Sequence, residues 1–204
     1  MRIGIFGGTF DPPHTGHKKY ADELKERLSL DKLIVIPTAT PPHKMRKDTS
    51  SAEDRLNMLK LLFDGESGAE VSDMEIARGG KSYTYETVTL LHGIYPDDEL
   101  IFLLGSDMLL SFHTWRNPDI ILSHVKICAV TRSNETDEKK LREYIEEYFP
   151  VDKERFITCD FDPIELSSTQ IRNAVRNGES IDGLVDEQVL KYIKEKELYL
   201  ERLD

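Results

Sequence analysis

The 204-residue sequence contains no apolar run near the roughly 18 residues that a membrane-spanning helix needs. It begins directly with a predicted strand, so no signal peptide is visible, and we expect a cytoplasmic protein that does not contact membranes. The sequence has two cysteines, Cys128 and Cys159, which lie in separate predicted strands without the spacing of metal ligands. This arrangement favours reduced, buried thiols over a disulfide or a zinc site.

Positive charge is also scarce, since 27 Lys and Arg against 38 Asp and Glu give a formal net charge of −11. Nucleic-acid binding needs a basic face, so this balance argues against nucleic acid as a partner. A small anionic ligand is still compatible, because local charge can oppose the overall sign. The common glycine-rich phosphate motifs GxxxxGK[ST] and GxGxxG are both missing.

What the sequence does have is a regular alternation of strand and helix patterns. Strands are predicted at residues 3–6, 33–36, 100–104, 125–130 and 156–159, with an extended stretch at 69–76. Helices are predicted from Thr15, from a Ser50–Glu53 capping box, over 82–92, after an Asn117 cap, over 137–149, over 168–177 and from Asp186. This alternation predicts an α/β fold with a doubly wound, mostly parallel sheet, in which ligands bind beyond the carboxyl ends of the strands.

Two histidines follow the first predicted strand. Gly7 and Gly8 are expected to end that strand in a tight turn, and His14 and His17 then stand three residues apart at a helix start. The helix N-terminus favours anions, and Gly16 leaves room for a ligand to approach the backbone. An alternative is a metal site, although two histidines alone are few ligands for zinc.

A second group of candidate residues lies at the start of the helix predicted over 168–177. Ser167, Ser168 and Thr169 provide three hydroxyls there, and Arg172 follows one turn later. Capping alone would explain hydroxyls at this place. Together with the histidines, however, they predict a phosphate-binding clamp.

The motifs that carry these residues resemble a known family. GGTFDPPHTGH, residues 7–17, and LSSTQIR, residues 166–172, resemble the T/HxGH and SSTxIR motifs of the bacterial nucleotidylyltransferases. Between them, TPPHK, SYTYET, LLGSDMLLSFHTW and the strand before Arg132 resemble successive blocks of the nicotinate mononucleotide adenylyltransferases. The sequence departs from the pattern at Ser106, where Ala is usual, and at Ser133-Asn134, where Pro-Gly is common.

The resemblance implies one Rossmann-like nucleotidylyltransferase domain over residues 1–204, in which helices from about residue 166 complete the site and pack on the core. It implies adenylyl transfer from ATP to nicotinate mononucleotide, giving deamido-NAD and pyrophosphate in NAD biosynthesis. It also implies Mg²⁺ as the cofactor that accompanies ATP, without protein ligands for the metal other than the candidate Asp107. The oligomeric state stays open, and a homo-oligomer is compatible.

The resemblance also assigns roles to particular residues. The catalytic residues it implies are His14, His17 and Arg172. For ATP it implies Gly7, Gly8, Thr9, Phe10, Gly16, Gly105, Asp107, Arg132, Ser167, Ser168 and Thr169. For the acceptor it implies His43, Lys44, Thr84, Trp115 and Arg116.

Other interpretations stay open at this point. Trp115 can be an ordinary packing residue, Asp107 a turn cap, and Lys44 part of a solvated basic loop. The acceptor can be that of a neighbouring branch, nicotinamide mononucleotide or a phosphopantetheine. A protein that binds ATP as a sensor without turning it over is a further alternative.

Overall fold

The computed structural model describes residues 1–40, 49–131, 135–162 and 165–200. Its centre is a six-stranded sheet with the strand order β3-β2-β1-β4-β5-β6, and every neighbouring pair is parallel. The strands are β1 (Arg2–Gly8), β2 (Lys32–Pro37), β3 (Ala69–Val71), β4 (Glu99–Gly105), β5 (Lys126–Thr131) and β6 (Phe156–Asp160). The order reverses between β1 and β4, so the predicted doubly wound fold is confirmed, with its switch point beside the histidine motif.

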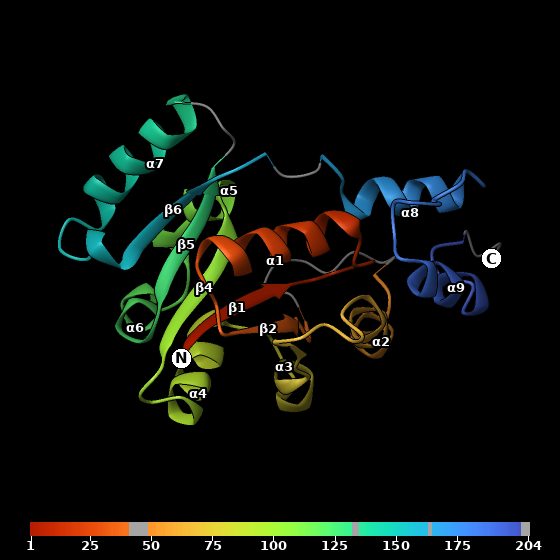
Figure 1. Ribbon diagram of the computed structural model, residues 1–204, viewed down its shortest axis with the longest axis horizontal. Helices are drawn as coiled ribbons and strands as arrows, with labels where there is room; N and C mark the ends of the chain where they lie inside the picture. The colour runs from red at the N-terminus through yellow and green to blue at the C-terminus, as the bar shows by residue number, and fades with distance from the viewer. Residues whose placement is uncertain (41–48, 132–134, 163–164, 201–204) are drawn as a thin grey trace.

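Helices cover both faces of this sheet (Figure 1). The longer ones are α1 (Thr15–Arg27), α2 (Ala52–Leu62), α4 (Thr84–Ile94), α6 (Pro118–His124), α7 (Glu135–Tyr148), α8 (Ser168–Arg176) and α9 (Glu187–Glu195). Shorter helical pieces are α3 (Met74–Arg78), α5 (Ser106–Leu109), η1 (Phe112–Thr114) and η2 (Lys153–Arg155). Within the described residues, no helix is both long enough and apolar enough to cross a bilayer.

Successive side chains of the central strands point to opposite faces and form two cores. On β1, Phe6 packs with the α1 residues Ala21 and Leu24, whereas Ile3 and Ile5 pack on the other face with residues of α4 and α6. Strands that are buried on both faces need continuous apolar runs, which explains why these strands were visible in the sequence.

The C-terminal helices lie beside α2 at the end of the molecule toward which β1 points (Figure 1). The Tyr192 hydroxyl on α9 donates to the Asp54 carboxylate at 2.9 Å and accepts from the Asn57 amide at 3.2 Å. These bonds join α9 to α2.

Several local predictions need correction. Gly7 and Gly8 do not form a turn, because both still pair with β2 as the last residues of β1. Gly8 instead makes room for a ring, since a Cβ there would lie 2.9 Å from the Phe10 side chain. The capping box predicted at Ser50 is wrong by one residue, because Ser51 has the same i, i+3 spacing and accepts from the Asp54 N–H at 3.0 Å.

Three further element predictions were partly wrong. The extended stretch at 69–76 ends at Val71 and continues into α3. Ser82 lies outside α4, and its hydroxyl accepts from the Ala39 N–H at 2.9 Å. Asn117 occupies the N-cap position of α6 but has a left-handed backbone (φ 53°), and its side chain makes no cap hydrogen bond.

Candidate active site

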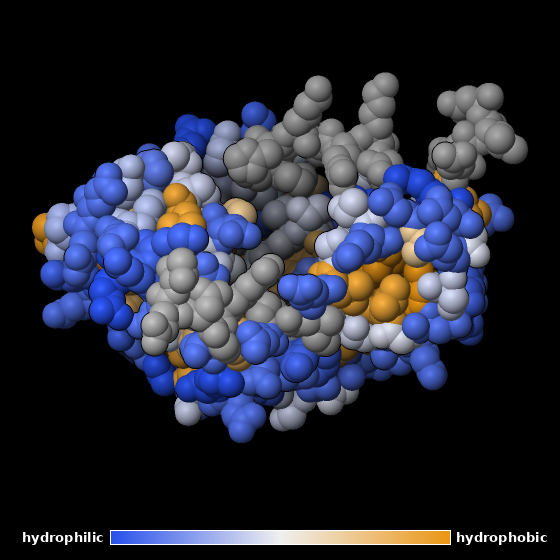
Figure 2. Space-filling view, turned by 90° about the horizontal axis from the view of Figure 1, so that it is seen from above, coloured by the Kyte–Doolittle hydropathy of each residue, from blue (hydrophilic) through white to orange (hydrophobic). Residues whose placement is uncertain are grey.

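A cavity of about 430 Å³ lies where the carboxyl ends of β1 and β4 meet the starts of α1 and α8. The sheet side of the cavity is apolar, and the helix starts supply its polar groups. Its lining residues are Phe6, Gly7, His14, Gly16, His17, Tyr20, Phe102, Leu103, Leu104, Gly105, Met108, Trp115, Leu166, Ser167 and Ser168. Seen from above, the largely hydrophilic surface is hollowed near the middle of the molecule (Figure 2). The cavity brings together eight of the predicted site residues from four separate segments: Gly7, His14, Gly16, His17, Gly105, Trp115, Ser167 and Ser168.

The two histidines cap α1 reciprocally. The His17 N–H donates to His14 Nδ1 at 3.3 Å, and the His14 N–H donates to His17 Nδ1 at 3.2 Å. Their rings stack with centroids 3.6 Å apart. A ring nitrogen that accepts a hydrogen bond carries no proton, so both neutral rings must bear their proton on Nε2. The capping arrangement therefore fixes two adjacent rings in the same tautomer, each with an N–H donor on the edge remote from the helix backbone.

Burial keeps both rings neutral. Desolvation lowers the pKa of His14 to about 4. Desolvation, and in addition the neighbouring His14, lower the pKa of His17 well below its usual value. A protonated ring would also lose the Nδ1 acceptor that holds the cap. At neutral pH the pair thus offers two uncharged donors. Among the described residues that line the cavity, none has an acidic side chain, which suits a polyanionic ligand.

The hydroxyls at the start of α8 are already engaged with protein groups. Ser167 accepts from the Gln170 N–H at 3.3 Å as the N-cap, so its predicted capping role is confirmed. The Ser168 hydroxyl donates to the Pro12 carbonyl at 2.8 Å, and Thr169 accepts from Arg172 at 3.1 Å. The Ser168 bond ties α8 to the segment that precedes the histidines, and the other two lie within α8 and its cap.

Arg172 does not line the cavity in the described part of the chain. Its side chain is 4% exposed, and Nη1 donates to the Asp11 carbonyl at 2.5 Å. The structure therefore places this guanidinium behind the histidine segment, and its predicted contact with phosphate stays a prediction.

Thr84, Trp115 and Arg116 are the described residues among those predicted to bind the acceptor. Trp115 is half-buried at the cavity edge, where its ring meets Phe102 and Phe112 edge-on with centroids 6.2 and 5.3 Å away. The next residue, Arg116, places its guanidinium 4.6 Å from the centre of the Tyr83 ring. Tyr83 is the N-cap of α4 and makes no side-chain cap, and Thr84 is the first helical residue. Arg116 and Tyr83 are thus in contact although they lie far apart in the sequence.

Other predicted residues lie elsewhere. The Thr9 carbonyl accepts from Arg55 at 2.9 Å, Phe10 is buried, and Asp107 is exposed in the first turn of α5. Thr9 and Phe10 thus support the segment that leads to the histidines. His43, Lys44 and Arg132 lie outside the described residues, so their predicted contacts stay predictions.

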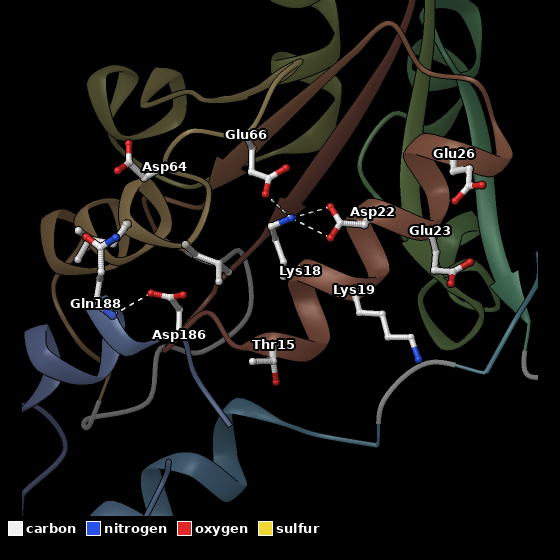
Figure 3. Close-up of a pocket in the computed structure, with 12 residues that line it drawn as sticks. Thr15, Lys18, Lys19, Asp22, Glu23, Glu26, Asp64, Glu66, Asp186 and Gln188 are labelled. Carbon is white, nitrogen blue, oxygen red and sulfur yellow. Dashed lines mark hydrogen bonds and ion pairs between the residues drawn. The ribbon is translucent and has the colours of Figure 1, made fainter. Parts of the chain in front are cut away.

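A second and larger cavity, of about 550 Å³, lies on the outer side of α1 (Figure 3). Its lining is acidic, and Lys18 at its centre is paired with Asp22 at 2.8 Å and Glu66 at 2.9 Å. The remaining carboxylates belong to Glu23, Glu26, Asp64 and Asp186. A nucleoside triphosphate would be repelled here, so charge identifies the smaller cavity as the candidate site.

The cytidylyltransferase-like family model matches residues 5–174. Among curated proteins, the "Probable nicotinate-nucleotide adenylyltransferase" of Desulfatibacillum aliphaticivorans is 39% identical over 98% of this chain and 100% of its own. The protein of the same name from Clostridium botulinum (strain Alaska E43 / Type E3) is 41% identical over 98% of both chains. The chain belongs to the nicotinate-nucleotide adenylyltransferases within the cytidylyltransferase-like family.

Solved structures support the same fold. Plasmodium falciparum nicotinic acid mononucleotide adenylyltransferase complexed with NaAD has a TM-score of 0.79 and 18% identity, and covers 100% of this chain and 99% of that chain. The same enzyme complexed with APC has a TM-score of 0.78 and 17% identity at the same coverage. At these identities the likeness concerns the arrangement of sheet and helices.

Sequence reasoning missed two supporting side chains. Tyr20 lines the cavity, stacks on Phe6 at 5.1 Å and donates to the Leu104 carbonyl at 2.8 Å. Its place one turn after His17 on the same helix face was a usable signal. Asp11 is buried directly before the cis Asp11–Pro12 bond, and nothing in its local sequence pattern distinguishes it from an exposed turn residue.

Proposed function

We propose that this family member transfers the adenylyl group of ATP to nicotinate mononucleotide, releasing pyrophosphate. The observation that carries the proposal is the pair of neutral Nε2–H donors of His14 and His17, whose rings stack 3.6 Å apart in a cavity with no acidic side chain among the lining residues that the structure describes. The close relatives that share the whole chain length support the same reaction.

The reaction asks for positioning and charge stabilisation. A phosphate monoester has its second pKa near 6, so the mononucleotide phosphate is largely a dianion at neutral pH and needs no general base. One of its oxygens attacks the α-phosphorus of ATP, the bond to the β-phosphate oxygen breaks, and pyrophosphate leaves with the electron pair. Fixed donors near the phosphates stabilise the charge that grows on the leaving group. His14 and His17 are such donors, because their cap bonds fix their orientation before ATP binds.

Magnesium enters this proposal with ATP. Among the described residues, no group of three or more His, Cys, Asp or Glu side chains is placed to hold a metal ion. We therefore assign Mg²⁺ to the phosphate oxygens of the nucleotide, where it neutralises charge. Asp107, exposed in the first turn of α5, is a candidate for its outer hydration shell.

The acceptor is bound at the start of α4. Here the free backbone N–H groups of a helix N-terminus attract a carboxylate. The Glu86 carboxylate of the same turn is offset by Arg78 at 3.4 Å and by the Tyr85 hydroxyl at 2.9 Å. Trp115, at the cavity edge, is placed to stack on a positively charged pyridine ring.

The test is pyrophosphate release by the purified protein with ATP, Mg²⁺ and a panel of acceptors. The panel contains nicotinate mononucleotide, nicotinamide mononucleotide and phosphopantetheine. We expect turnover and a dinucleotide product with nicotinate mononucleotide. If ATP binds but no acceptor releases pyrophosphate, the transfer proposal is wrong and the sensor alternative replaces it.

A further inference from the structure

The carboxylate of Asp11, three residues before His14, is buried and joins several segments of the chain; we call it the Asp11 junction. Asp11 is 4% exposed. Oδ1 accepts from the Ser50 N–H at 3.2 Å, from the Ser50 hydroxyl at 2.5 Å and from the Tyr199 hydroxyl at 2.8 Å. Oδ2 lies 3.9 Å from Arg172 Nη1. A buried carboxylate is costly unless such donors surround it, so this set of bonds holds four segments in one arrangement.

Tyr199 reaches this junction from the far end of the chain, 188 residues away. It is 8% exposed, and its backbone has a left-handed conformation (φ 66°) that a bulky side chain rarely adopts. Burial raises the pKa of its hydroxyl, so the group stays protonated and donates to Asp11. A strained backbone persists where the surroundings hold it, and here the buried bond to Asp11 is one such constraint.

The Asp11 junction lies in the backbone segment that leads to the histidines, and this segment is also held through its carbonyls. The carbonyls of Thr9, Asp11 and Pro12 accept from Arg55, Arg172 and Ser168 at 2.9, 2.5 and 2.8 Å. The path from β1 to the helix cap is therefore held from α2 and α8 through its carbonyls, and from Tyr199 through the Asp11 side chain. A change at Asp11 is passed on to the place where the His14 and His17 rings stand.

We propose that Asp11 and Tyr199 are positioning residues for the adenylyl transfer, with Tyr199 acting through Asp11. This inference rests on the proposed function. Neither side chain lines the cavity among the described residues, so neither is expected to contribute much to substrate binding. Catalytic donors must stand within fractions of an ångström of the developing charge, so a small shift of the histidine pair lowers turnover more than affinity.

The experiment compares Tyr199→Phe with Tyr192→Phe. Both remove one buried or half-buried hydroxyl that joins the C-terminal segment to an aspartate, but Tyr192 bonds to Asp54 on α2 rather than to Asp11. We expect kcat to fall about tenfold in Tyr199→Phe with the KM of both substrates within about twofold of wild type. Tyr192→Phe keeps the wild-type kcat. Equal kcat values for the two variants would overturn the inference, whereas an inactive wild type would instead overturn the proposed function.

Two further measurements test the route of the effect. In an Asp11→Ala background, Tyr199→Phe is expected to lower kcat no further, because the acceptor of the Tyr199 hydroxyl is already gone. Multiplying effects would show that Tyr199 does not act through Asp11. The second readout needs no turnover: the imidazole C–H signals of His14 and His17 in NMR spectra. These signals shift in Tyr199→Phe and not in Tyr192→Phe. Unshifted signals in both variants would contradict the inference even if Asp11→Ala does not fold.

Discussion

At the scale of single residues, the sequence prediction and the proposed chemistry agree best at the pair of His14 and His17. The sequence predicted the place of His14 and His17, at the helix start after β1. The sequence could not predict the reciprocal cap or the resulting tautomer, because both depend on ring orientations that residue spacing does not determine. The reciprocal cap fits neutral rings, because each Nδ1 accepts a hydrogen bond and so carries no proton.

His17→Ala removes one of the two Nε2–H donors. Because the donor is most valuable when charge builds on the leaving pyrophosphate, we expect kcat to fall about 100-fold or more while ATP affinity changes little. Steady-state kinetics and calorimetric ATP titration measure the two effects. His92→Ala, a substitution on α4 remote from the cavity, is the control. A variant that folds and retains near-normal turnover would remove His17 from the mechanism.

The lowered pKa of His14 also predicts a pH dependence of stability. The unfolded ring takes up a proton below about pH 6.5, and the folded ring only near 4, so the folded state loses stability as the pH falls through this interval. For this shift the loss is at most about 3 kcal/mol. Urea unfolding between pH 7 and 4 measures it.

His14→Asn is the matched variant, because Asn also caps a helix but does not titrate. We expect its free energy of unfolding to fall less between pH 6.5 and 4 than that of the wild type. Parallel curves for the two proteins would show that His14 is not held neutral by the fold.

At the scale of elements, the short helical turn η1 carries Trp115 to the cavity. The His113 N–H donates to the Tyr144 hydroxyl of α7 at 2.8 Å, and the His113 ring stacks on Tyr148 at 4.1 Å. This anchoring sets the direction in which the chain leaves η1. The sequence identified Trp115 through the resemblance, but the support from α7 connects residues about 30 positions apart that no local pattern links.

Trp115→Ala is expected to raise the KM for nicotinate mononucleotide about tenfold, since a stacked cation–π contact contributes on the order of 1–2 kcal/mol. The KM for ATP should change little. Trp115 is the one tryptophan of the chain, so binding of the mononucleotide to the wild-type protein should also change its fluorescence. An unchanged KM for nicotinate mononucleotide together with unchanged fluorescence would show that Trp115 is only a packing residue.

One element prediction failed because two neighbouring residues offered the same local chemistry. Ser50 and Ser51 both precede an acidic residue at i+3, and the sequence could not tell which one caps α2. Tertiary structure decides which serine is the cap, because the Ser50 hydroxyl donates to the buried Asp11 carboxylate. The alternating strands and long amphipathic helices carried stronger signals and were predicted with shifts of a few residues at their ends.

At the scale of the whole molecule, the parallel sheet brings the ends of β1 and β4 to one edge, and with them residues of three distant motifs. This is why the rule that ligands bind beyond the carboxyl ends of the strands indicated much of the cavity from the sequence. The net charge of −11 is compatible with this arrangement. Acidic groups line the second cavity on the outer side of α1, whereas the described residues that line the candidate site include none.

The choice of acceptor is the central claim of this account. Nicotinate and nicotinamide have nearly the same shape, so the start of α4 must distinguish a carboxylate from an amide. Charge-assisted hydrogen bonds contribute about 1.5–3 kcal/mol against about 1 for neutral ones, and an amide would also face a donor with its own NH₂ group. The decisive measurement is kcat/KM for the two mononucleotides at one pH and Mg²⁺ concentration. We predict at least a roughly tenfold preference for nicotinate mononucleotide, and equal values or a preference for nicotinamide mononucleotide would contradict it.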